Sequence, residues 1–512
     1  MKKITILLAL LLLLTGCGKQ METAPKTVTA GTIPAVTEQT TTEAETVSAE
    51  SVPVEETGFV SFDIYAINDL HGRFVDTDAQ PGLDELTTYL NQAQQSGNRI
   101  LLATGDMWQG TAESYATNGR IITQWMNRTG FDAMTMGGHE YDWGEDGIRE
   151  NLDLAQFPFL GINVYSRETD SRVDYCESSL VVEFEGVQIG IIGAIGDCYS
   201  SISAEHTKDV YFKTGAELTE LVKAESEKLR SLGADFIIYT LHDGYDQTYD
   251  GVNPISVEEL DYYDVTLSQG YVDLVFEADS HFWYVLQDQQ GVYHLQAGGN
   301  NEGLSYASVM IDKSSGNYYI LNAELQAAGK YSYMEDDPLP NQLLEEYAAE
   351  VEPVTKVLGR NGQYRNSGKI CQLVADLYCA EGVEKWGKEY DIVLGGGYIS
   401  CRSPWYLPVG DVTYSQLFSL LPFDNQITLC SIQGRDLLDK FLETDNDAYY
   451  IKTTAYGDRI RNTIDPDGIY YVVTDSYSAY YAYNNMTVVD IYDPNVFARD
   501  LIAEQIAKGA LK

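Results

Sequence analysis

Basic residues are scarce in this chain of 512 residues, and their scarcity limits what it can bind. It has 33 lysines and arginines against 77 aspartates and glutamates, which gives a formal net charge of −44 at pH 7. Binding to a nucleic-acid backbone through a broad surface needs many cations to replace its counterions. The composition therefore predicts no nucleic-acid partner, and an anionic small substrate would need locally placed metal ions and arginines.

Cysteine is rare as well, and the chain has no long apolar run after its first 17 residues. Seven cysteines without a CxxC pair exclude a dense disulfide framework and a zinc-type thiolate site. Cys176 and Cys198 either pair or stay as buried free thiols, and the sequence leaves both open. No later segment is long and apolar enough for a second membrane span. A monomer is the default expectation.

The N-terminus predicts export. Lys2 and Lys3 precede an apolar run from Ile4 to Leu14, and Leu-Thr-Gly-Cys follows, ending at Cys17. This pattern resembles a bacterial lipoprotein signal peptide, in which the cysteine is acylated and becomes the new N-terminus. An ordinary cleaved signal peptide is the alternative. We expect an exported protein that lipidated Cys17 anchors to the extracellular face of the cell membrane.

Beyond this segment, an acidic stretch without aromatic residues precedes a long globular region. The stretch is too poor in apolar side chains to offset its ordering entropy, so we expect it to be disordered. In the globular region, apolar runs alternate with helical periodicity, which predicts an α/β fold. Strands are predicted over residues 59–67, 100–103, 181–185, 188–193, 236–241, 274–277 and 292–297, and helices over 82–96 and 216–232.

Four of the six histidines lie in short polar blocks, most of which follow predicted strands. The blocks are Asp69-Leu70-His71-Gly72, Gly105-Asp106, Gly138-His139-Glu140-Tyr141-Asp142, Leu241-His242-Asp243-Gly244 and Asp279-Ser280-His281. Open α/β sheets place ligand sites beyond the carboxyl ends of their strands. Carboxylate and imidazole groups that converge there suit a two-metal phosphoesterase site, in which a carboxylate such as Asp106 bridges the ions.

His139 and Asp142 are three positions apart, and this spacing lets the aspartate orient or charge-stabilise the imidazole if a helix begins there. His139 would then protonate the leaving oxygen or hold transition-state charge. His206 and His294 have no such setting and are interpreted as surface or packing residues.

The blocks resemble those of the bacterial and ecto-5′-nucleotidase family, which includes UDP-sugar hydrolases and 2′,3′-cyclic-nucleotide phosphodiesterases. Ile67-Asn68-Asp69-Leu70-His71-Gly72, Gly105-Asp106-Met107-Trp108-Gln109-Gly110-Thr111 and Gln296-Ala297-Gly298-Gly299 carry the resemblance. It implies a calcineurin-like metallophosphoesterase α/β sandwich followed by a smaller α/β substrate domain. The expected segments are a signal peptide over 1–17, a stalk over 18–57, a metallophosphoesterase domain over 58–330, a linker or helix over 331–360 and a 5′-nucleotidase C-terminal domain over 361–512.

The resemblance also assigns roles to residues and shows two departures. It implies one or two divalent ions (zinc, manganese, cobalt or iron) with His139 and Asp142 as the catalytic pair, and the metal ligands would be Asp69, His71, Asp106, His242 and His281. The family's asparagine ligand is replaced by Gly138, which has no side chain to donate. Asp279 stands where the family has a histidine ligand, and its oxygen can still bind a metal. We therefore expect the second metal ion to bind weakly or not at all.

The C-terminal part shows the same mixture of match and departure. The segment Leu421-Pro422-Phe423-Asp424-Asn425 is similar to the family's base-stacking segment, with Phe423 as the stacking ring. Gly395-Gly396-Gly397 matches the glycine-rich substrate loop, so Gly396 and Gly397 are candidate binding residues. Arg365 and Arg402 are candidate anion clamps or ordinary surface cations. Tyr481 belongs to a tyrosine-rich replacement of the second stacking loop. A connecting helix is predicted over 345–358.

Two functions remain open on this basis. The chain is either a lipid-anchored hydrolase that releases phosphate from nucleotides or related phosphoesters, or a catalytically impaired surface lipoprotein that kept the fold to bind a nucleotide or another ligand. Gly138 and Asp279 support the second hypothesis.

Overall fold

The computed structural model describes residues 58–76, 81–196, 202, 206–244, 270–288, 290–402, 404–442, 449–482 and 485–511. The predictions on the signal peptide, the stalk, Cys17 and Cys198 lie outside these ranges. The chain from Thr57 to Lys512 is one compact unit. Among the described residues, no helix is both long and apolar enough to cross a membrane.

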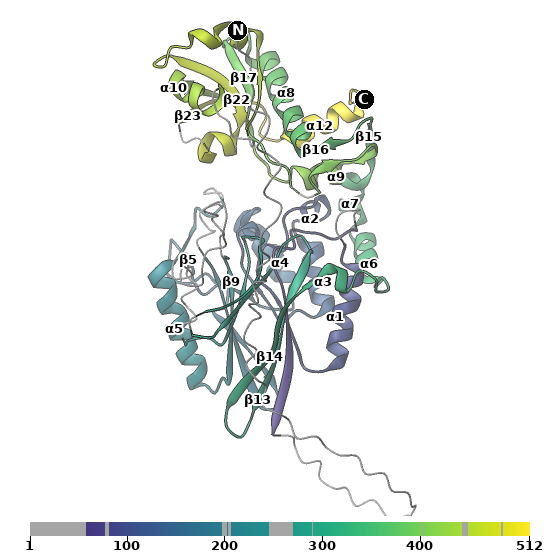
Figure 1. The fold of residues 1–512 in the computed structure, drawn as a ribbon, viewed down its shortest axis with the longest axis vertical. Helices are drawn as coiled ribbons and strands as arrows, with labels where there is room; N and C mark the ends of the chain where they lie inside the picture. Colours follow the sequence, from purple (N-terminus) through teal and green to yellow (C-terminus); the bar gives the residue numbers. More distant parts are fainter. Residues whose placement is uncertain are drawn as a thin grey trace, which may run out of the picture. The chain divides into compact units, whose positions relative to one another are not determined.

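Two six-stranded sheets dominate the first part of this unit (Figure 1). The first sheet has the order β14 (Asn317–Ala327), β13 (Gly303–Asp312), β1 (Phe59–Ile67), β2 (Arg99–Ala103), β3 (Ala133–Thr135) and β4 (Phe159–Leu160). The second has the order β11 (Trp283–Gln287), β12 (Tyr293–Ala297), β10 (Leu274–Glu277), β9 (Phe236–His242), β7 (Val187–Ile195) and β6 (Ser179–Phe184). Strands β1 to β4 run parallel, as do β7, β9, β10 and β12, so their carboxyl ends deliver the loops that follow them.

A shared apolar core joins the two sheets. Phe62 and Ile64 of β1 pack in one cluster with Ile191 of β7 and Phe236 of β9, and the rings of Phe62 and Phe236 are 6.0 Å apart in an edge-on arrangement. Because alternate side chains of a strand point to opposite faces, β1 has a second apolar face, which Tyr65 and other residues provide.

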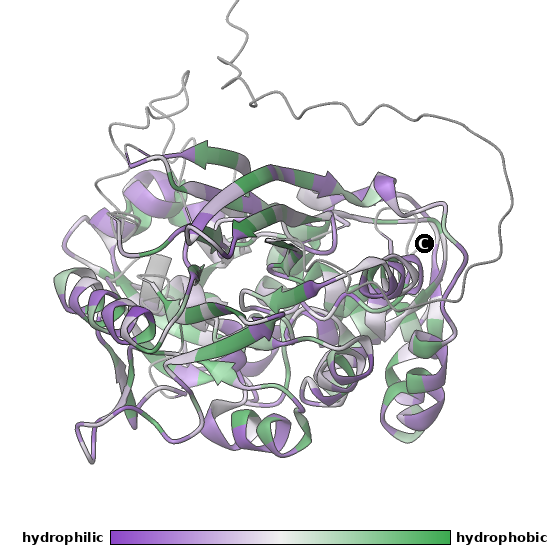
Figure 2. Ribbon diagram, turned by 90° about the horizontal axis from the view of Figure 1, so that it is seen from below, coloured by the Kyte–Doolittle hydropathy of each residue, from purple (hydrophilic) through white to green (hydrophobic). Residues whose placement is uncertain are grey.

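Helices cover the outer faces of both sheets, which gives four layers. Apolar residues of α1 (Asp84–Ser96), α3 (Arg120–Thr129) and α4 (Gly144–Leu154) pack on the first sheet, and α5 (Gly215–Ser231) packs on the second. Figure 2 shows hydrophilic and hydrophobic residues on different sides of these helices. The predicted strands and helices are confirmed, with ends that differ by a few residues at most.

The C-terminal part is a smaller α/β layer arrangement. Its sheet has the order β21 (Tyr449–Thr453), β17 (Ile392–Tyr398), β22 (Ile469–Asp475), β20 (Ile427–Gln433) and β23 (Met486–Ile491). Helices α8 (Ser367–Trp386), α9 (Tyr414–Leu420) and α12 (Ala498–Ala507) contribute to an apolar cluster with this sheet. The predicted fold class, an α/β sandwich followed by a smaller α/β domain, is confirmed.

The predicted connecting helix over 345–358 is wrong in detail. The structure has two helices, α6 (Leu339–Glu346) and α7 (Ala348–Thr355), and then β15 (Val357–Asn361), which pairs with β19 (Gly410–Thr413). Tyr347 ends the first helix and begins the second. The exposed Val357 and half-buried Leu358 continue the apolar pattern, but they follow Lys356, whose extended backbone ends the helix.

Candidate metal centre and active site

The polar blocks meet at the carboxyl ends of the parallel strands. Asp69 and His71 follow β1, Asp106 follows β2, and His139 follows β3. His242 is the last residue of β9, and Asp279 and His281 follow β10. One donor atom from each of three residues lies within 4.8 Å of the others in three overlapping groups: Asp69, His71 and His281; Asp69, Asp106 and His242; His71, Asp106 and His139. Mixed oxygen and imidazole donors of this kind suit divalent transition metals.

Left-handed backbone conformations bring these donors together. The φ angles are 49° at Asp69, 51° at His71, 54° at Asp106, 64° at Asp279 and 57° at His281. Residues other than glycine rarely adopt this region, and each such residue costs about 1–3 kcal/mol that the surrounding structure must supply. Five candidate metal ligands therefore share a strained conformation that aims them at a common centre.

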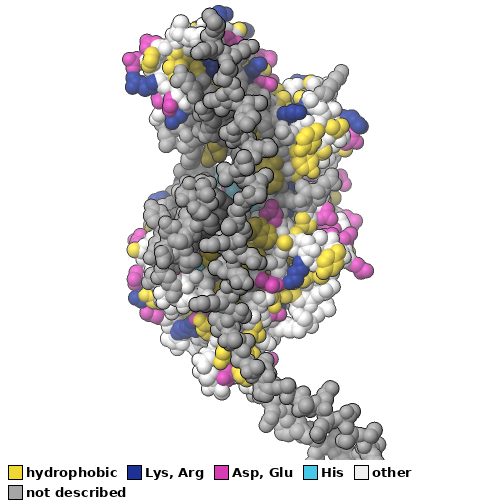
Figure 3. Space-filling model, viewed as in Figure 1, with side chains coloured by type: hydrophobic (Ala, Val, Ile, Leu, Met, Phe, Trp, Pro, Cys, Tyr) yellow, Lys and Arg dark blue, Asp and Glu magenta, His cyan; other side chains and the backbone are white. Residues whose placement is uncertain are grey.

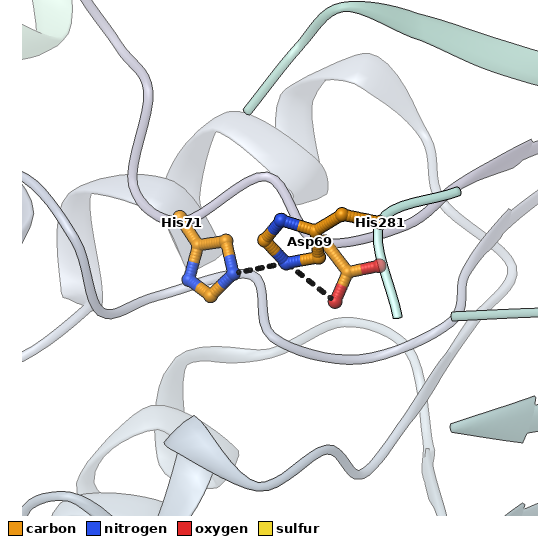
Figure 4. A group of neighbouring side chains, drawn as sticks. All are labelled: Asp69, His71 and His281. Atoms are coloured by element: carbon orange, nitrogen blue, oxygen red, sulfur yellow. Dashed lines mark hydrogen bonds and ion pairs between the residues drawn. The ribbon is translucent and has the colours of Figure 1, made fainter. Parts of the chain in front are cut away.

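The first donor group consists of Asp69, His71 and His281 (Figure 4). His281 Nε2 lies 3.0 Å from His71 Nε2 and 3.6 Å from Asp69 Oδ1. The carboxylate of Asp69 also accepts hydrogen bonds from Asn68 Nδ2 at 2.7 Å and from the Asp279 amide at 3.1 Å. Burial, together with the charge of His281, lowers the pKa of His71 to about 3, so its imidazole stays neutral and free to donate to a metal.

Asp106 joins this group to the second donor group. Its Oδ1 lies 3.2 Å from His242 Nε2, and its Oδ2 lies 4.0 Å from His71 Nε2. His242 Nδ1 donates to the Thr104 carbonyl at 2.7 Å, which leaves Nε2 directed at Asp106. Gly105, with φ 96°, leaves room for this ring, since a Cβ there would lie 2.3 Å from His242 Nδ1. Asp106 is thus placed to bridge two ions.

The two departures, Gly138 and Asp279, lie beside the second group. A Cβ on Gly138 would lie 3.6 Å from Ile202 Cγ1 and 3.9 Å from Asp106 Oδ1, so there is room for a side chain beside the bridging carboxylate. Asp279 Oδ1 lies 4.0 Å from His242 Nε2, and Asp279 belongs to none of the three groups found among the described residues. Burial raises the pKa of Asp279 to about 6.

Glu140 received no role from the sequence but supports this half of the site. Its buried carboxylate accepts hydrogen bonds from the amides of Asp106, Met107 and Gly137 at 2.8–2.9 Å. These bonds fix the loop after β2 against the loop after β3. Glu140 therefore holds Asp106 in place, and its position inside the Gly-His-Glu block was the available sequence signal.

His139 and Asp142 adopt the predicted pairing. His139 opens a 3₁₀ turn, His139–Tyr141, and its Nδ1 lies 2.9 Å from Asp142 Oδ2. Burial disfavours the charged ring, but the carboxylates of Asp142 and Asp106 outweigh burial and raise the pKa of His139 to about 10. Bound cations would act in the opposite direction. The His139 amide also donates to Asp106 Oδ1 at 2.8 Å, which ties the pair to the donor cluster.

The side chains of His71, His139 and His281 are 12%, 27% and 35% exposed, so the cluster is open to solvent on one side. Figure 3 shows small areas of histidine on the face that it draws. A small anion can therefore reach the cluster.

Phe423, the candidate stacking residue, lies against His139. The two rings are stacked with centroids 5.7 Å apart and an interplanar angle of 22°. The guanidinium carbon of Arg402 lies 5.1 Å from the centre of the Phe423 ring. Arg402 also contributes to the electrostatic environment of His281. The structure thus brings Phe423 and Arg402 from the C-terminal part to the edge of the donor cluster.

Arg499 of α12 is a further functional residue that no sequence pattern marks. Its buried guanidinium donates to the carbonyls of Leu421 and Phe423 at 3.3 and 3.0 Å and pairs with Asp424. Asp424 also accepts a hydrogen bond from the hydroxyl of Tyr115 in α2 (Ala112–Ala116). Arg499 therefore fixes the segment that carries Phe423, and Asp424 connects that segment to the metal-binding part.

The remaining predicted substrate residues behave differently. Arg365 is buried, and its guanidinium donates to Asn361 and to the Gln363 carbonyl near its own strand. Gly396 and Gly397 lie within the buried strand β17, where a Cβ would lie 2.1 Å from the Tyr450 carbonyl and 2.5 Å from Thr474 Oγ1. Packing of the sheet itself therefore requires both glycines. The side chain of Tyr481 lies outside the described part of the chain.

His294 is a packing residue, as expected. It is fully buried on β12, with Nδ1 3.0 Å from Glu277 Oε1 and Nε2 3.5 Å from Asp288 Oδ2. His206 is half-buried. Cys176 is a buried free thiol.

Comparison with known proteins finds one matching family model and several distant relatives. Residues 348–489 match the family of the 5′-nucleotidase C-terminal domain. Over 414 residues the chain is 26% identical to Endonuclease YhcR of Bacillus subtilis, a match that covers 74% of this chain and 32% of that protein. The chain thus spans about a third of that relative's length. Over 483 residues it is 24% identical to Protein UshA of Yersinia enterocolitica, covering 80% of this chain and 84% of that protein.

A solved structure supports the fold over most of the chain. The 5′-nucleotidase precursor of Thermus thermophilus superposes with a TM-score of 0.65 at 17% identity, covering 88% of this chain and 97% of that one. The predicted relationship to the bacterial 5′-nucleotidases is confirmed by these matches.

Proposed function

We propose that this chain, a relative of the bacterial 5′-nucleotidases whose residues 348–489 match their C-terminal domain, is a metal-dependent hydrolase that releases phosphate from nucleotides or related phosphoesters. The observation that carries the proposal is the convergence of Asp69, His71, Asp106, His242 and His281 from four strand ends. UDP-sugars and cyclic nucleotides are candidate substrates within this class.

The donor set fits divalent ions. Asp69, His71 and His281 would hold one ion, His242 and Asp279 would hold a second, and Asp106 would bridge them. Zinc, manganese, cobalt and iron all accept such oxygen and nitrogen donors. When bound, the ions supply charge that polarises the phosphoryl oxygens and lowers the pKa of a water molecule.

The side chains of this chain supply proton transfer and orientation. His139, held by Asp142, is placed to give a proton to the leaving oxygen or to stabilise negative charge that develops beside Asp106. Phe423 offers an aromatic face to a base, and Arg402 offers a fork of donors to an anion. A nucleotide would need Phe423 to separate from His139, because the two rings now stack on each other.

The signal sequence and Cys17 support export and lipid anchoring to the extracellular face of the membrane. The net charge of −44 supports a small-molecule substrate in preference to a nucleic acid. We take the chain to act as a monomer.

A catalytically impaired lipoprotein that binds a nucleotide is the second candidate. Gly138 has no donor, and Asp279 lies outside the compact donor groups of the described residues. Both observations indicate weaker binding of the second ion in particular. Loss of one ion of a two-metal site reduces turnover severely.

The deciding experiment measures hydrolysis by the full chain of AMP, UDP-glucose, 2′,3′-cyclic AMP and single-stranded DNA under each of the four metals, as phosphate release from AMP and as chromatographic separation of the products for the other three. Asp69→Ala removes a donor with φ 49°, and Asp170→Ala is the matched control, because Asp170 has φ 51° and lies exposed outside the cluster.

The proposal expects metal-dependent release from a nucleotide that Asp69→Ala abolishes and Asp170→Ala retains. Release that survives Asp69→Ala would reject the assigned site. Nucleotide binding without any hydrolysis would favour the impaired binder, and cleavage of DNA alone would reject the small-molecule substrate class.

A further inference from the structure

Two buried cysteines of the C-terminal part face each other beside Arg402. Cys371 lies on α8, and Cys401 follows β17. Their Sγ atoms are 3.6 Å apart, although the residues are 30 positions apart in sequence. Cys371 is 1% exposed and Cys401 is 6% exposed. Among the cysteines that the structure describes, this is the pair whose sulfur atoms are in contact.

The separation of these sulfur atoms is that of two thiols in van der Waals contact. A disulfide needs an S–S distance of about 2.0 Å, so the two sulfur atoms must approach each other further for the bond to form. Cys176, Cys379 and Cys430 are also buried free thiols, and Cys430 Sγ instead contacts Thr428 Oγ1 at 3.3 Å. Contact between sulfur atoms therefore distinguishes Cys371 and Cys401 from other buried cysteines.

We propose that Cys371 and Cys401 form a disulfide that holds the loop carrying Arg402 against α8. The oxidant is a disulfide compound or a thiol–disulfide oxidoreductase of the compartment into which the chain is exported. The Cys371 thiolate attacks a sulfur of that disulfide and forms a mixed disulfide, releasing one thiolate. Cys401 loses its proton to solvent and attacks the Cys371 sulfur, which releases the second thiolate. Two protein thiols are oxidised and one external disulfide is reduced to two thiols.

The local chemistry favours Cys371 as the first nucleophile. A hydrogen bond from the Cys401 thiol lowers the pKa of Cys371, and Ser367 Oγ, 4.0 Å from Cys371 Sγ, acts in the same direction. A lower pKa increases the thiolate fraction that reacts. Because both sulfurs are buried in the folded protein, we expect the bond to form while the chain folds.

The bond would act on the substrate side of the site. Arg402 directly follows Cys401 in the chain. Its guanidinium lies 5.1 Å from the Phe423 ring, which stacks on His139. Tying Cys401 to α8 restricts the loop and therefore the positions that the guanidinium can take. This consequence for substrate rests on the proposed function, whereas the bond itself does not.

Peptide mapping tests the bond directly. The full chain is refolded with oxidised glutathione, alkylated under denaturing conditions and digested with trypsin, before and after reduction. Trypsin leaves Cys371 and Cys379 in one peptide, since Lys369 and Lys385 flank both, so Cys379→Ser is the matched control. The proposal expects a peptide pair linked to Cys401 that persists in Cys379→Ser and disappears in Cys371→Ser.

Thermal unfolding gives an independent reading. Reduction should lower the unfolding temperature of the wild type and of Cys379→Ser by several degrees, and it should leave Cys371→Ser and Cys401→Ser unchanged. Complete alkylation of Cys371 and Cys401 under denaturing conditions, in wild type that was first refolded with oxidised glutathione, overturns the proposal, as does a link between Cys401 and Cys379.

If the chain hydrolyses nucleotides, reduction should raise KM about three- to tenfold with little change in kcat, because Arg402 then loses its fixed position. The same treatment should not alter KM in Cys371→Ser. A linked peptide without hydrolysis would leave the bond established and reject only the proposed activity. A protein that hydrolyses nucleotides but yields no linked peptide would reject the bond and leave the proposed activity standing.

Discussion

The donor cluster has two halves, one around Asp69, His71 and His281 and the other around His242, Gly138 and Asp279. The two halves differ in the donors that their side chains provide, but both contain residues with a left-handed backbone conformation. In the first half, His281 Nε2 lies 3.0 Å from His71 Nε2 and 3.6 Å from Asp69 Oδ1. In the second half, Gly138 contributes no donor, and Asp279 Oδ1 stays 4.0 Å from His242 Nε2. The second half nevertheless keeps the left-handed conformation at Asp279, with φ 64°.

This difference indicates that the scaffold of the second half is intact although that half has fewer side-chain donors within the groups found among the described residues. Glu140 still binds the amides of Asp106, Met107 and Gly137, and His242 still donates to the Thr104 carbonyl. The strained conformation at Asp279 is costly, and its retention fits a residue whose side chain must still point at the cluster. The following predictions separate the contribution of the donors from that of the scaffold.

The largest effect is expected from Asp106→Asn, because Asp106 belongs to both halves. The amide keeps the size of the side chain but removes the negative charge that would hold two ions together. We expect phosphate release to fall by roughly 10³-fold, the loss that follows removal of a major electrostatic contribution to a transition state. Initial rates under saturating metal check this.

Asp132→Asn is the control for that change. Asp132 is a half-buried aspartate, and it accepts a hydrogen bond from the Leu101 amide outside the donor groups. Equal losses in both variants would mean that folding, and not the bridging charge, is affected.

Local sequence patterns predicted this donor cluster well. The apolar runs indicated β1 and β10 with their observed ends, and parallel strands bring the residues after each strand to one edge. Asp69 and Asp106 were therefore predictable as neighbours. The break between α6 and α7 was not, because Tyr347 is not a helix-breaking residue and the apolar pattern continues through it.

Contacts between distant segments could not be predicted from the sequence. Arg499 lies 75 positions from Asp424, and Tyr115 lies 309 positions from it. Nothing in their neighbouring residues marks these partners, since each is an ordinary residue of a short helix or loop. The contact of Cys371 with Cys401 is of the same kind. Only the folded arrangement shows that these side chains meet.

His294→Gln tests the scaffold that supports the half of the cluster with Gly138 and Asp279. Burial disfavours the charged imidazole, but Glu277 and Asp288 outweigh burial and raise the pKa of His294 to about 9. A group with a raised folded pKa stabilises the protein fully below its unfolded pKa, about 6.5, and loses this effect as pH rises through 9. The difference corresponds to about 3 kcal/mol of unfolding free energy.

Urea unfolding of the wild type and of His294→Gln at pH 6 and pH 9.5 measures this effect. The wild type should be the more stable at pH 6, and its advantage should shrink at pH 9.5. A difference that stays constant with pH would show that His294 acts through packing alone.

Restoring the second half should produce a gain. In Gly138→Asn the new Cβ makes only ordinary contacts with Ile202 and Asp106, and Asp279→His supplies an imidazole in place of a carboxylate. With both changes, we expect affinity for a second ion to rise about 10- to 100-fold, and turnover to rise with it. Metal titration by calorimetry and phosphate release measure the two effects separately.

Gly329→Asn is the control for the added asparagine, because Gly329 is exposed, a Cβ there meets no atom within 4 Å, and its φ, like that of Gly138, is not in the left-handed region. A double variant that gains a metal but no turnover would show that the C-terminal part, and not the donor set, limits catalysis.

The smallest effect is expected from Tyr115→Phe, which removes one hydroxyl between the metal-binding part and the segment that carries Phe423. The ring that packs 4.8 Å from Phe418 remains, but Asp424 loses the hydrogen bond from Tyr115. Since a hydrogen bond of this kind contributes about 1 kcal/mol net, we expect KM for a nucleotide to change about fivefold while kcat stays nearly constant.

Tyr211→Phe is the matched control, because its hydroxyl also donates to an aspartate, Asp170, away from the cluster. A rise in KM would mean that the contact holds Phe423 in a position that binds substrate. A fall would mean that the contact holds Phe423 against His139 and that substrate must break it, so the sign of the change decides which arrangement the structure represents.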